Sequence, residues 1–310
     1  MRRTLMLLLG LIASLGLPGG VATAADKLAI GYTNASANSL DFIAKENGYF
    51  DANGLDVDLV SLAGTAVLVP SIVSGAIQVG TAPPPVLVQS AKAGLDLVAL
   101  TGITELDPGA RDSAIVRRPS VAIAVPMDLK GKRIAVSTIG SISQILLEDW
   151  LNREGVPPGG VNYVEIPFNQ MSNILRQGTI DAALLTEPFL GRAVASGDGV
   201  AQFYFMAEEP AGVVATSNIA SRAWARSHPD IVARFRKSIA AAERFSNEKP
   251  DAAKQIIGKW LKLSPELMRA TSLPKAHAGI TASDLEWWVN VMRPQGLIDG
   301  DVKAGTMIAP

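Results

Sequence analysis

The stretch between Asp128 and Phe189 constrains the fold more than any other part of the chain. Short apolar segments end at Val136 and span 161–166 and 180–185, and two helix-like segments separate them. An alternation of strand and helix over about 60 residues predicts a parallel sheet with helices on its faces. Ligands of such sheets bind at the carboxyl ends of the strands. The side chains at those ends are therefore the first candidates for a binding site.

The residues at these strand ends are small, polar or aromatic, and none has the pattern of a catalytic group. Ser141 stands three residues before Gln144, which matches a capping box at a helix start. Free backbone N–H groups near this helix start, with the helix dipole, would bind carboxylate, sulfonate or nitrate oxygens without a basic side chain. The predicted ligand contacts of this half are Ser137, Thr138, Ser141, Phe168, Asn169 and Glu187.

Two of these residues keep an alternative interpretation. Glu187 either contacts a hydroxyl, amine or ring N–H of the ligand, or holds its turn by bonding to nearby backbone. Phe168, like Tyr32 and Phe189, either stacks on a planar ligand or packs in the core. The strand ends therefore predict small-molecule binding and leave the charge of the molecule open.

The chain before residue 113 shows the same alternation of strands and helices. Pro70 lies inside one helical segment, and because a proline in a helix interior costs about 3 kcal/mol, this helix starts late or kinks. Pro83, Pro84 and Pro85 open another helix, where their missing N–H groups have no partner to lose. The predicted strands are 27–32, 56–62, 76–80 and 95–102, and the predicted helices are 40–47, 65–74 and 81–93.

Short segments of small and polar residues follow the strands of this first half. Such residues are turn formers by default, but loops on a rigid scaffold often carry binding side chains. The proline-rich helix start offers few N–H donors, so we expect it to contribute shape and an apolar wall. The predicted ligand contacts of this half are Asn34, Ser36, Asn38, Gly64, Thr65, Thr81, Ala82 and Pro83.

Further strand candidates flank the central stretch. Those at 113–117 and 121–125 precede it, and we interpret them as the crossing into a second lobe. Those at 202–205 and 212–216 follow it, and the second of these is the predicted return crossing. From residue 219 onward the apolar residues keep helical spacing, so the rest of the chain is predicted to be mostly helical.

The composition argues against several classes of protein. The 310 residues are enough for two domains, and 48% hydrophobic against 18% charged residues supports a large core. A formal net charge of −1 without Lys/Arg runs argues against nucleic-acid binding. No cysteine is present for thiol catalysis, metal binding or a lipid anchor. His228 and His277 have no acidic residue at metal-ligand spacing, and no Gly-x-Ser-x-Gly elbow occurs, so we expect no metal, no cofactor and no enzyme activity.

The N-terminus has the pattern of a secretory signal peptide. Arg2 and Arg3 precede an apolar run from Leu5 to Leu17, a Pro-Gly-Gly break follows, and Ala22-Thr23-Ala24 supplies the small residues of a cleavage site. A short membrane anchor is the alternative, but the run is too short for a span. We therefore expect residues 1–24 to be removed and the mature protein to be periplasmic, without a lipid anchor.

Several motifs in this order resemble the solute-binding proteins of ABC transporters for nitrate, sulfonates, taurine and related molecules. The resemblance covers nearly the whole mature chain, and each motif is weak by itself. No fixed basic or aromatic anchor of that family maps onto this sequence, which leaves the solute undefined. The matching segments are 44–50 (AKENGYF), 54–57 (GLDV), 74–80 (SGAIQVG), 128–132 (DLKGK), 178–183 (GTIDAA) and Glu187-Pro188.

The resemblance implies a type II periplasmic-binding-protein fold of the α/β class. Each lobe would be a mixed, mostly parallel sheet flanked by helices, with the ligand cleft between the lobes. Lobe 1 is expected to be discontinuous, at 25–117 plus 213–310, and lobe 2 to span 118–212. The C-terminal helices would then rejoin the first lobe.

The resemblance also implies a function without chemistry. A monomer would capture a small organic or oxyanion solute by hinge closure and deliver it to an inner-membrane permease with its ATPase. Two alternatives remain open. One is an enzyme or precursor-binding protein of the same fold that acts on a thiamine-precursor pyrimidine or an aromatic carboxylate, and the other is a chemoreceptor partner.

Overall fold

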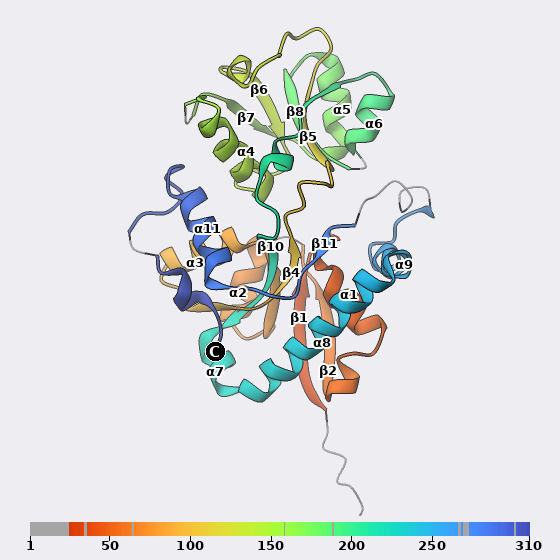
Figure 1. Cartoon of the computed structure of the whole chain (residues 1–310), viewed down its shortest axis with the longest axis vertical. Coiled ribbons are helices and arrows are strands. Elements are labelled where there is room, and N and C mark those ends of the chain that lie inside the picture. The colour runs from red at the N-terminus through yellow and green to blue at the C-terminus, as the bar shows by residue number, and fades with distance from the viewer. Residues whose placement is uncertain are drawn as a thin grey trace, which may run out of the picture.

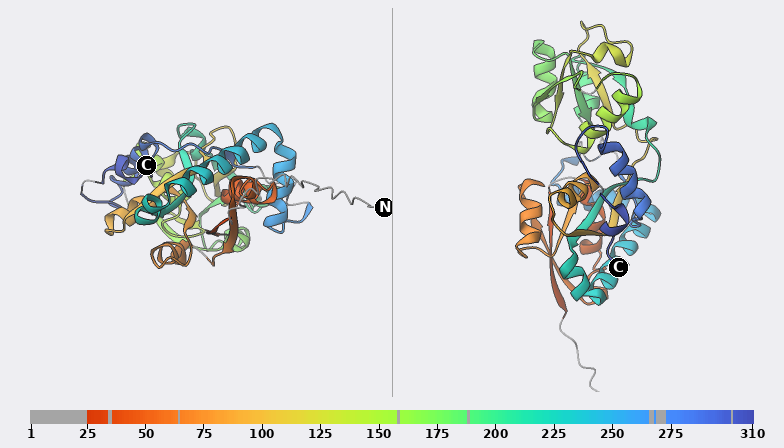
Figure 2. Two further views of the ribbon diagram at one scale, coloured as in Figure 1. Left: turned by 90° about the horizontal axis from the view of Figure 1, so that it is seen from below. Right: turned by 90° about the vertical axis from the view of Figure 1, so that its left-hand side faces the viewer.

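The structure is a computed structural model that describes residues 25–33, 36–63, 65–157, 159–187, 189–265, 268, 273–300 and 302–310. The predicted signal peptide at 1–24 therefore lies outside the described residues. The described strands form two sheets, and Figure 1 shows them one above the other, with β4 and β10 leading from the lower to the upper. Figure 2 shows the same separation from the side.

The first sheet is mixed and has the strand order β11-β4-β10-β3-β1-β2. Strands β1, β2 and β3 run parallel, whereas β10 runs antiparallel to both of its neighbours. The predicted strands of the first half are present with ends shifted by at most three residues. Their bounds are β1 Asp26–Tyr32, β2 Leu55–Ser61, β3 Val79–Ala82, β4 Leu97–Glu105, β10 Val214–Ser221 and β11 Lys275–Ala276.

The second sheet has the order β7-β6-β8-β5-β9 and confirms the alternation predicted from the central stretch. Strand β6 pairs in parallel with β7 and β8, while β5 pairs antiparallel with β8 and β9. The bounds are β5 Ser113–Arg117, β6 Arg133–Val136, β7 Asn162–Glu165, β8 Ala182–Thr186 and β9 Val200–Phe203.

Two expectations about the crossing are wrong. No strand forms at 121–125, because the N–H groups of Ala124 and Val125 bond to the Asp128 carboxylate at 2.8 and 3.1 Å instead of to a neighbouring strand. Strand β5, which we assigned to the first lobe, belongs to the second sheet. The chain therefore crosses earlier, between β4 and β5 at residues 106–112, and it returns at 204–213.

Helices cover both faces of each sheet and carry most of the core. On the first sheet, α2, α3 and α11 pack on one face and α1, α8 and α9 on the other. The late start predicted from Pro70 is confirmed, since a 3-10 turn at Thr65–Val67 precedes α2. The bounds are α1 Ser39–Glu46, α2 Leu68–Val73, α3 Pro84–Lys92, α4 Ile142–Arg153, α5 Phe168–Gln177, α6 Phe189–Ala195, α7 Arg222–Ser227, α8 Pro229–Glu248, α9 Pro250–Trp260 and α11 Ala282–Met292.

One hydrophobic cluster runs across both sheets. It joins Leu285 and Trp288 of α11 to Leu146 and Trp150 of α4, and α5 and α6 pack on the opposite face of the second sheet. The side chain of Gln295, after α11, also donates to the Ile145 carbonyl at 2.9 Å. Helix α11 therefore lies on the first sheet and contacts α4, which packs on the second sheet. Within the described residues, no helix is both long and apolar enough to cross a membrane.

Gly102 of β4 allows the segment before α11 to pack against the first sheet. A Cβ atom at this position would lie 2.3 Å from the Gly279 carbonyl oxygen and 2.5 Å from that of His277. Because both atoms are backbone, we expect Gly102→Ala to lower the free energy of unfolding by about 1–3 kcal/mol in urea denaturation. Gly305→Ala is the control, since the nearest atom to its Cβ is 4.0 Å away. Equal stability of the two variants would contradict this account.

Candidate functional site

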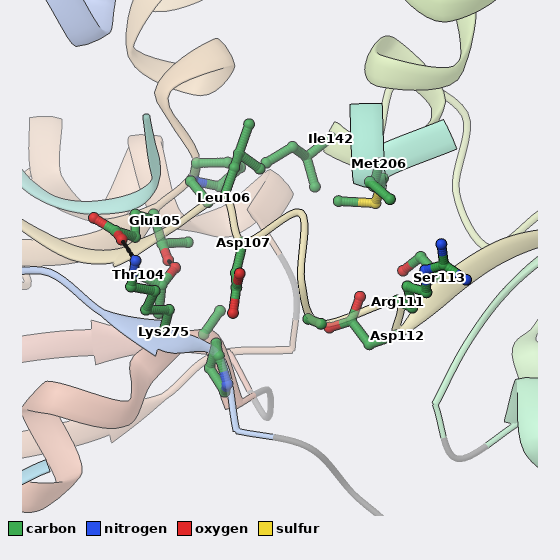
Figure 3. A pocket seen from close by; sticks show the side chains of 17 residues that line it. Thr104, Glu105, Leu106, Asp107, Arg111, Asp112, Ser113, Ile142, Met206 and Lys275 are labelled. Atoms are coloured by element: carbon green, nitrogen blue, oxygen red, sulfur yellow. Dashed lines mark hydrogen bonds and ion pairs between the residues drawn. The ribbon is translucent and has the colours of Figure 1, made fainter. Parts of the chain in front are cut away.

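A cavity of about 260 Å³ lies between the two sheets, where the chain passes from β4 to β5. Figure 3 shows its side chains coming from the crossing segment, from the first turn of α4 and from β11. A 3-10 turn at Phe205–Glu208 and the start of β10 complete the wall. The cavity is therefore lined by residues from both sheets and from both crossing segments.

The side of the cavity on the first sheet is formed by paired threonines. Thr104 of β4 and Thr216 of β10 are opposite each other in the sheet, both are buried, and their hydroxyl groups hydrogen-bond to one another. A hydroxyl both donates and accepts, so this pair offers a small polar patch to a ligand. Leu106, Ile142, Met206 and Ala215 supply much of the remaining, apolar wall.

Each cation of the cavity wall already has a partner. Lys275 Nζ lies 2.5 Å from Glu105 Oε1, and this hydrogen bond and charge raise the pKa of Lys275. Glu105 Oε2 also lies 3.2 Å from His277 Nδ1. The Arg111 guanidinium lies over the Tyr204 ring, 5.5 Å from its centroid. Neither cation projects as an isolated charge into the cavity.

Two further carboxylates, Asp107 and Asp112, line the same cavity (Figure 3). Asp107 Oδ1 accepts a hydrogen bond from the Gly109 N–H at 3.0 Å. Burial raises the pKa of Asp112, a hydrogen bond from Ser113 lowers it in part, and the charge of Asp107 adds to the increase. The crossing segment therefore carries an excess of negative charge.

A buried polar network lies at the start of α1, close to the cavity residues Ala37 and Pro83. Asp41 accepts hydrogen bonds from Thr81 Oγ1 at 2.7 Å and Asn218 Nδ2 at 3.0 Å, and the three side chains are at most 4% exposed. Burial raises the pKa of Asp41 to about 6, although both hydrogen bonds lower it. The network connects α1 to β3 and β10, so it fixes the helix that directly follows the 3-10 turn Ser36–Asn38, from which Ala37 lines the cavity.

The ligand contacts predicted in the first half of the chain lie in several different places, and this cavity is one of them. Pro83 lines it and supplies the apolar wall expected of the proline-rich turn, whereas Thr81 belongs to the Asp41 network and Ala82 is buried. Ser36 lines a smaller hollow beside α9. Asn38 is buried and donates to the Thr33 carbonyl at 2.6 Å. Asn34, Gly64 and the side chain of Thr65 lie outside the described residues.

None of the predicted contacts of the second half lines the cavity. Ser141 caps α4 by accepting from the Gln144 N–H, which confirms the cap, and the next residue, Ile142, lines the cavity. Phe168 stacks on Phe189 with centroids 5.5 Å apart. Glu187 accepts from the Gly191 N–H at 3.2 Å, as the turn-holding alternative predicts. Ser137 is half-buried, Thr138 and Asn169 are exposed, and a ligand contact of any of these residues stays a prediction.

The anion site expected at the start of α4 is partly occupied by the chain itself. The Gly140 N–H donates to Gln144 Oε1 at 2.6 Å, and the Ile139 N–H donates to Glu165 Oε2 at 3.0 Å. Ser141 N–H donates to the Thr138 carbonyl at 3.2 Å. The expectation of free amides near Gly140 is therefore wrong for these groups, since local side chains and a turn satisfy them.

Sequence reasoning missed the crossing segment 106–112 as part of the cavity, together with Thr104, Glu105, Thr216 and Lys275. Residues 103–112 have the composition of a turn-rich loop, which does not distinguish a connection from a site. Glu105 and Lys275 are far apart in sequence and meet only because β11 pairs with β4. The described residues contain no cluster of three or more His, Cys, Asp or Glu side chains that could hold a metal ion.

Two mixed sheets with flanking helices and a cavity at their junction define the fold of a periplasmic binding protein. The structure is similar to the aliphatic sulphonate-binding protein SsuA of Escherichia coli, with a TM-score of 0.74 at 17% identity over 92% of this chain and 97% of that one. The nitrate-binding protein NrtA of Synechocystis PCC 6803 gives 0.70 at 14% identity over 91% and 84%. The desulfurization enzyme DszB gives 0.66 at 18% identity over 92% and 96%. These similarities confirm the predicted fold.

The family is established by sequence. The model of the NMT1/THI5-like family matches residues 38–253, and the chain belongs to this family. A candidate binding protein of Brucella abortus (strain 2308) is 25% identical over 231 residues, which are 73% of this chain and 68% of that one. A candidate ABC transporter periplasmic binding protein of Brachyspira hyodysenteriae is 44% identical over 69 residues, or 22% and 20%. The resemblance inferred from the motifs is thus confirmed.

Proposed function

We propose that this chain is the periplasmic solute-binding component of an ABC importer. It captures a small organic molecule or oxyanion as a monomer and presents it to an inner-membrane permease with its ATPase. The observation that carries the proposal is the cavity at the junction of the two sheets, which takes residues from both. The names of the family's binding proteins support the same class of function, while the sulfonate and nitrate relatives are too distant to define the solute.

The crossing segments provide the hinge that this function needs. The Leu106 N–H donates to the Val213 carbonyl at 2.8 Å, and the Gly212 N–H donates to the Leu106 carbonyl at 3.3 Å, so the two connections pair with each other. A solute in the cavity contacts groups on both sides of this pair. It therefore favours the conformation in which both sides are close, which is closure by population shift.

Binding explains the cavity better than catalysis does. The fold also occurs in the desulfurization enzyme, so an enzyme remains the alternative function. The described side chains that line the cavity include no histidine, and the sequence has no cysteine. Its threonines bond to each other, and Lys275 is paired to Glu105. This set orients a guest by hydrogen bonds and charge, and it has no activated nucleophile.

A thermal-shift screen tests the proposal. The panel contains sulfonates, taurine, nitrate, aromatic carboxylates, pyrimidines and amines. A ligand of the folded state at about 100 times its dissociation constant stabilises that state by about 2.7 kcal/mol, or a few degrees in melting temperature. We expect Ala110→Trp, which fills the cavity from the crossing loop, to weaken the identified ligand at least about tenfold.

Ala195→Trp is the matched control because Ala195 is exposed on α6 and does not line the cavity. It should bind the ligand as the unmodified protein does, and both variants should keep the native circular dichroism spectrum. Three results oppose the proposal: a panel without a stabilising compound, full affinity in Ala110→Trp, or turnover of the bound compound.

A further inference from the structure

We infer that the solute carries a protonated amine on a small apolar body, and that the Asp112 carboxylate pairs with this amine. The inference rests on the proposed function and adds the chemical class of the solute. The inferred amine differs from the sulfonate and nitrate ligands named for the structural relatives, because the inference follows from the charges of this cavity.

The cavity has more carboxylates than available cations. Glu105, Asp107 and Asp112 face Lys275 and Arg111. Lys275 Nζ lies 2.5 Å from Glu105 Oε1. This hydrogen bond, the charge of Glu105 and the charge of Asp107 raise the pKa of Lys275. Arg111 lies over the Tyr204 ring. Neither Asp107 nor Asp112 forms a salt bridge to a described Lys, Arg or His side chain, but Asp107 is exposed to solvent, whereas Asp112 is half-buried.

The position of Asp112 makes this unpaired charge costly. Asp112 is half-buried at the end of the crossing segment, immediately before β5, and its backbone carbonyl is taken by the Glu187 N–H at 2.8 Å. The hydrogen bond from Ser113 compensates this burial only in part, so a positive group that enters the cavity stabilises the carboxylate further. Figure 3 shows the Asp107 carboxylate on the same cavity, so the local field is negative as well. A cationic nitrogen relieves both effects.

The rest of the lining defines the body of the solute. Leu106, Ile142, Met206 and Ala215 surround the charged groups, and Pro83 adds a rigid apolar wall. The Thr104–Thr216 hydroxyl pair adds uncharged polar groups on the first sheet. A cavity of about 260 Å³ with this lining fits a compact aliphatic or aromatic group bearing one nitrogen, with a hydroxyl or carbonyl directed at the threonines.

The alternative is an anionic solute. The start of α4, which was expected to hold it, has several of its N–H groups already hydrogen-bonded within the protein. The N–H groups of Ile139 and Gly140 bond to Glu165 and Gln144, as described above. An anion in the cavity that paired with Arg111 would lie beside Asp107 and Asp112. Like charges at short range oppose that arrangement.

The test uses four compounds with one phenylmethyl body and different head groups: benzylamine, benzyl alcohol, phenylacetate and phenylmethanesulfonate. Binding to the full chain is measured by isothermal titration calorimetry at pH 7.5, where benzylamine is protonated. We expect the amine to bind most tightly. Asp112→Asn should weaken it by about tenfold to hundredfold, since a charge-assisted hydrogen bond is lost, and should leave the alcohol unchanged. Asp58→Asn, at an exposed position of β2, is the control with the same change of charge.

The outcomes separate this inference from the proposed function. Preferred binding of phenylacetate or phenylmethanesulfonate, or equal binding of all four compounds, overturns the inference and leaves solute binding in place. An amine that binds Asp112→Asn as tightly as the unmodified protein also overturns it. If none of the four compounds binds, the ligand found in the thermal-shift panel tests the inference instead. A ligand without a cationic nitrogen refutes it. Far-UV circular dichroism checks that Asp112→Asn is folded.

Discussion

Replacing Asn218 by alanine is expected to lower the free energy of unfolding by about 3–5 kcal/mol at pH 8, because the buried Asp41 carboxylate loses a hydrogen-bond partner. Asn218 is fully buried in β10, donates to Asp41 Oδ1 at 3.0 Å, and accepts from Thr81 Oγ1 at 2.9 Å. The substitution leaves the Asp41 carboxylate with less compensation in a site that is closed to water. Urea denaturation followed by circular dichroism measures the loss.

The effect should depend on pH in a defined direction. Burial raises the pKa of Asp41 from 3.8 to about 6, so the folded protein prefers the neutral acid. The stability that this group contributes is fully present below about pH 4 and is lost as the pH rises through about 6. Without Asn218 the pKa rises further, because a hydrogen bond to the carboxylate is gone. We therefore expect a loss of only about 2 kcal/mol at pH 5.

The hydrogen-bond geometry supports the neutral acid independently. Thr81 Oγ1 lies 2.7 Å from Asp41 Oδ2 and 2.9 Å from Asn218 Oδ1, but a hydroxyl has one proton to donate. Protonation of Asp41 reverses its bond with Thr81: the acid then donates to Thr81 Oγ1, Thr81 donates to Asn218 Oδ1, and Asn218 donates back to Asp41. Asp41→Asn has the same donor and acceptor positions, so it serves as the control. It should be at least as stable as the unmodified protein at pH 8, with a flatter pH profile, and equal pH profiles would contradict this assignment.

The order of the elements was predictable from the sequence because local patterns encode it. Glycine and proline mark the ends of segments, and the apolar periodicity distinguishes the strands from the helices between Asp128 and Phe189. The strand expected at 121–125 shows the limit of this reasoning. Its apolar composition is that of a strand, but a single carboxylate, Asp128, bonds to its N–H groups and removes them from any sheet.

The cavity could be predicted only in part, because its residues meet through tertiary pairing. Pro83 was predicted from its own local chemistry, and it lines the cavity. Glu105 and Lys275 are 170 residues apart, and only the pairing of β4 with β11 brings them together. Thr81, predicted as a ligand contact, bonds to the buried Asp41, and a contact with the ligand stays a prediction. Local sequence carries no signal that separates these outcomes.

Replacing Trp288 by alanine should also destabilise the protein by about 3–5 kcal/mol, because a fully buried indole leaves a large cavity. Trp288 of α11 has no exposed surface and packs in the cluster that joins α11 to α4. Its Nε1–H donates to the Val214 carbonyl at 2.8 Å, and Asp284 of the same helix accepts from the Val214 N–H at 3.3 Å. The first residue of β10 is thus held on both sides by α11.

The neighbouring Trp287 is the matched control. It contacts Trp288 edge-to-face, with centroids 4.9 Å apart, but it is only half-buried. We expect Trp287→Ala to cost about 1 kcal/mol, mainly the lost ring contact. Since Ala215 and Thr216 follow Val214 and line the cavity, Trp288→Ala should in addition weaken solute binding, whereas Trp287→Ala should not. Equal losses of stability in the two variants, or unchanged affinity in Trp288→Ala, would show that α11 covers the first sheet without supporting the binding site.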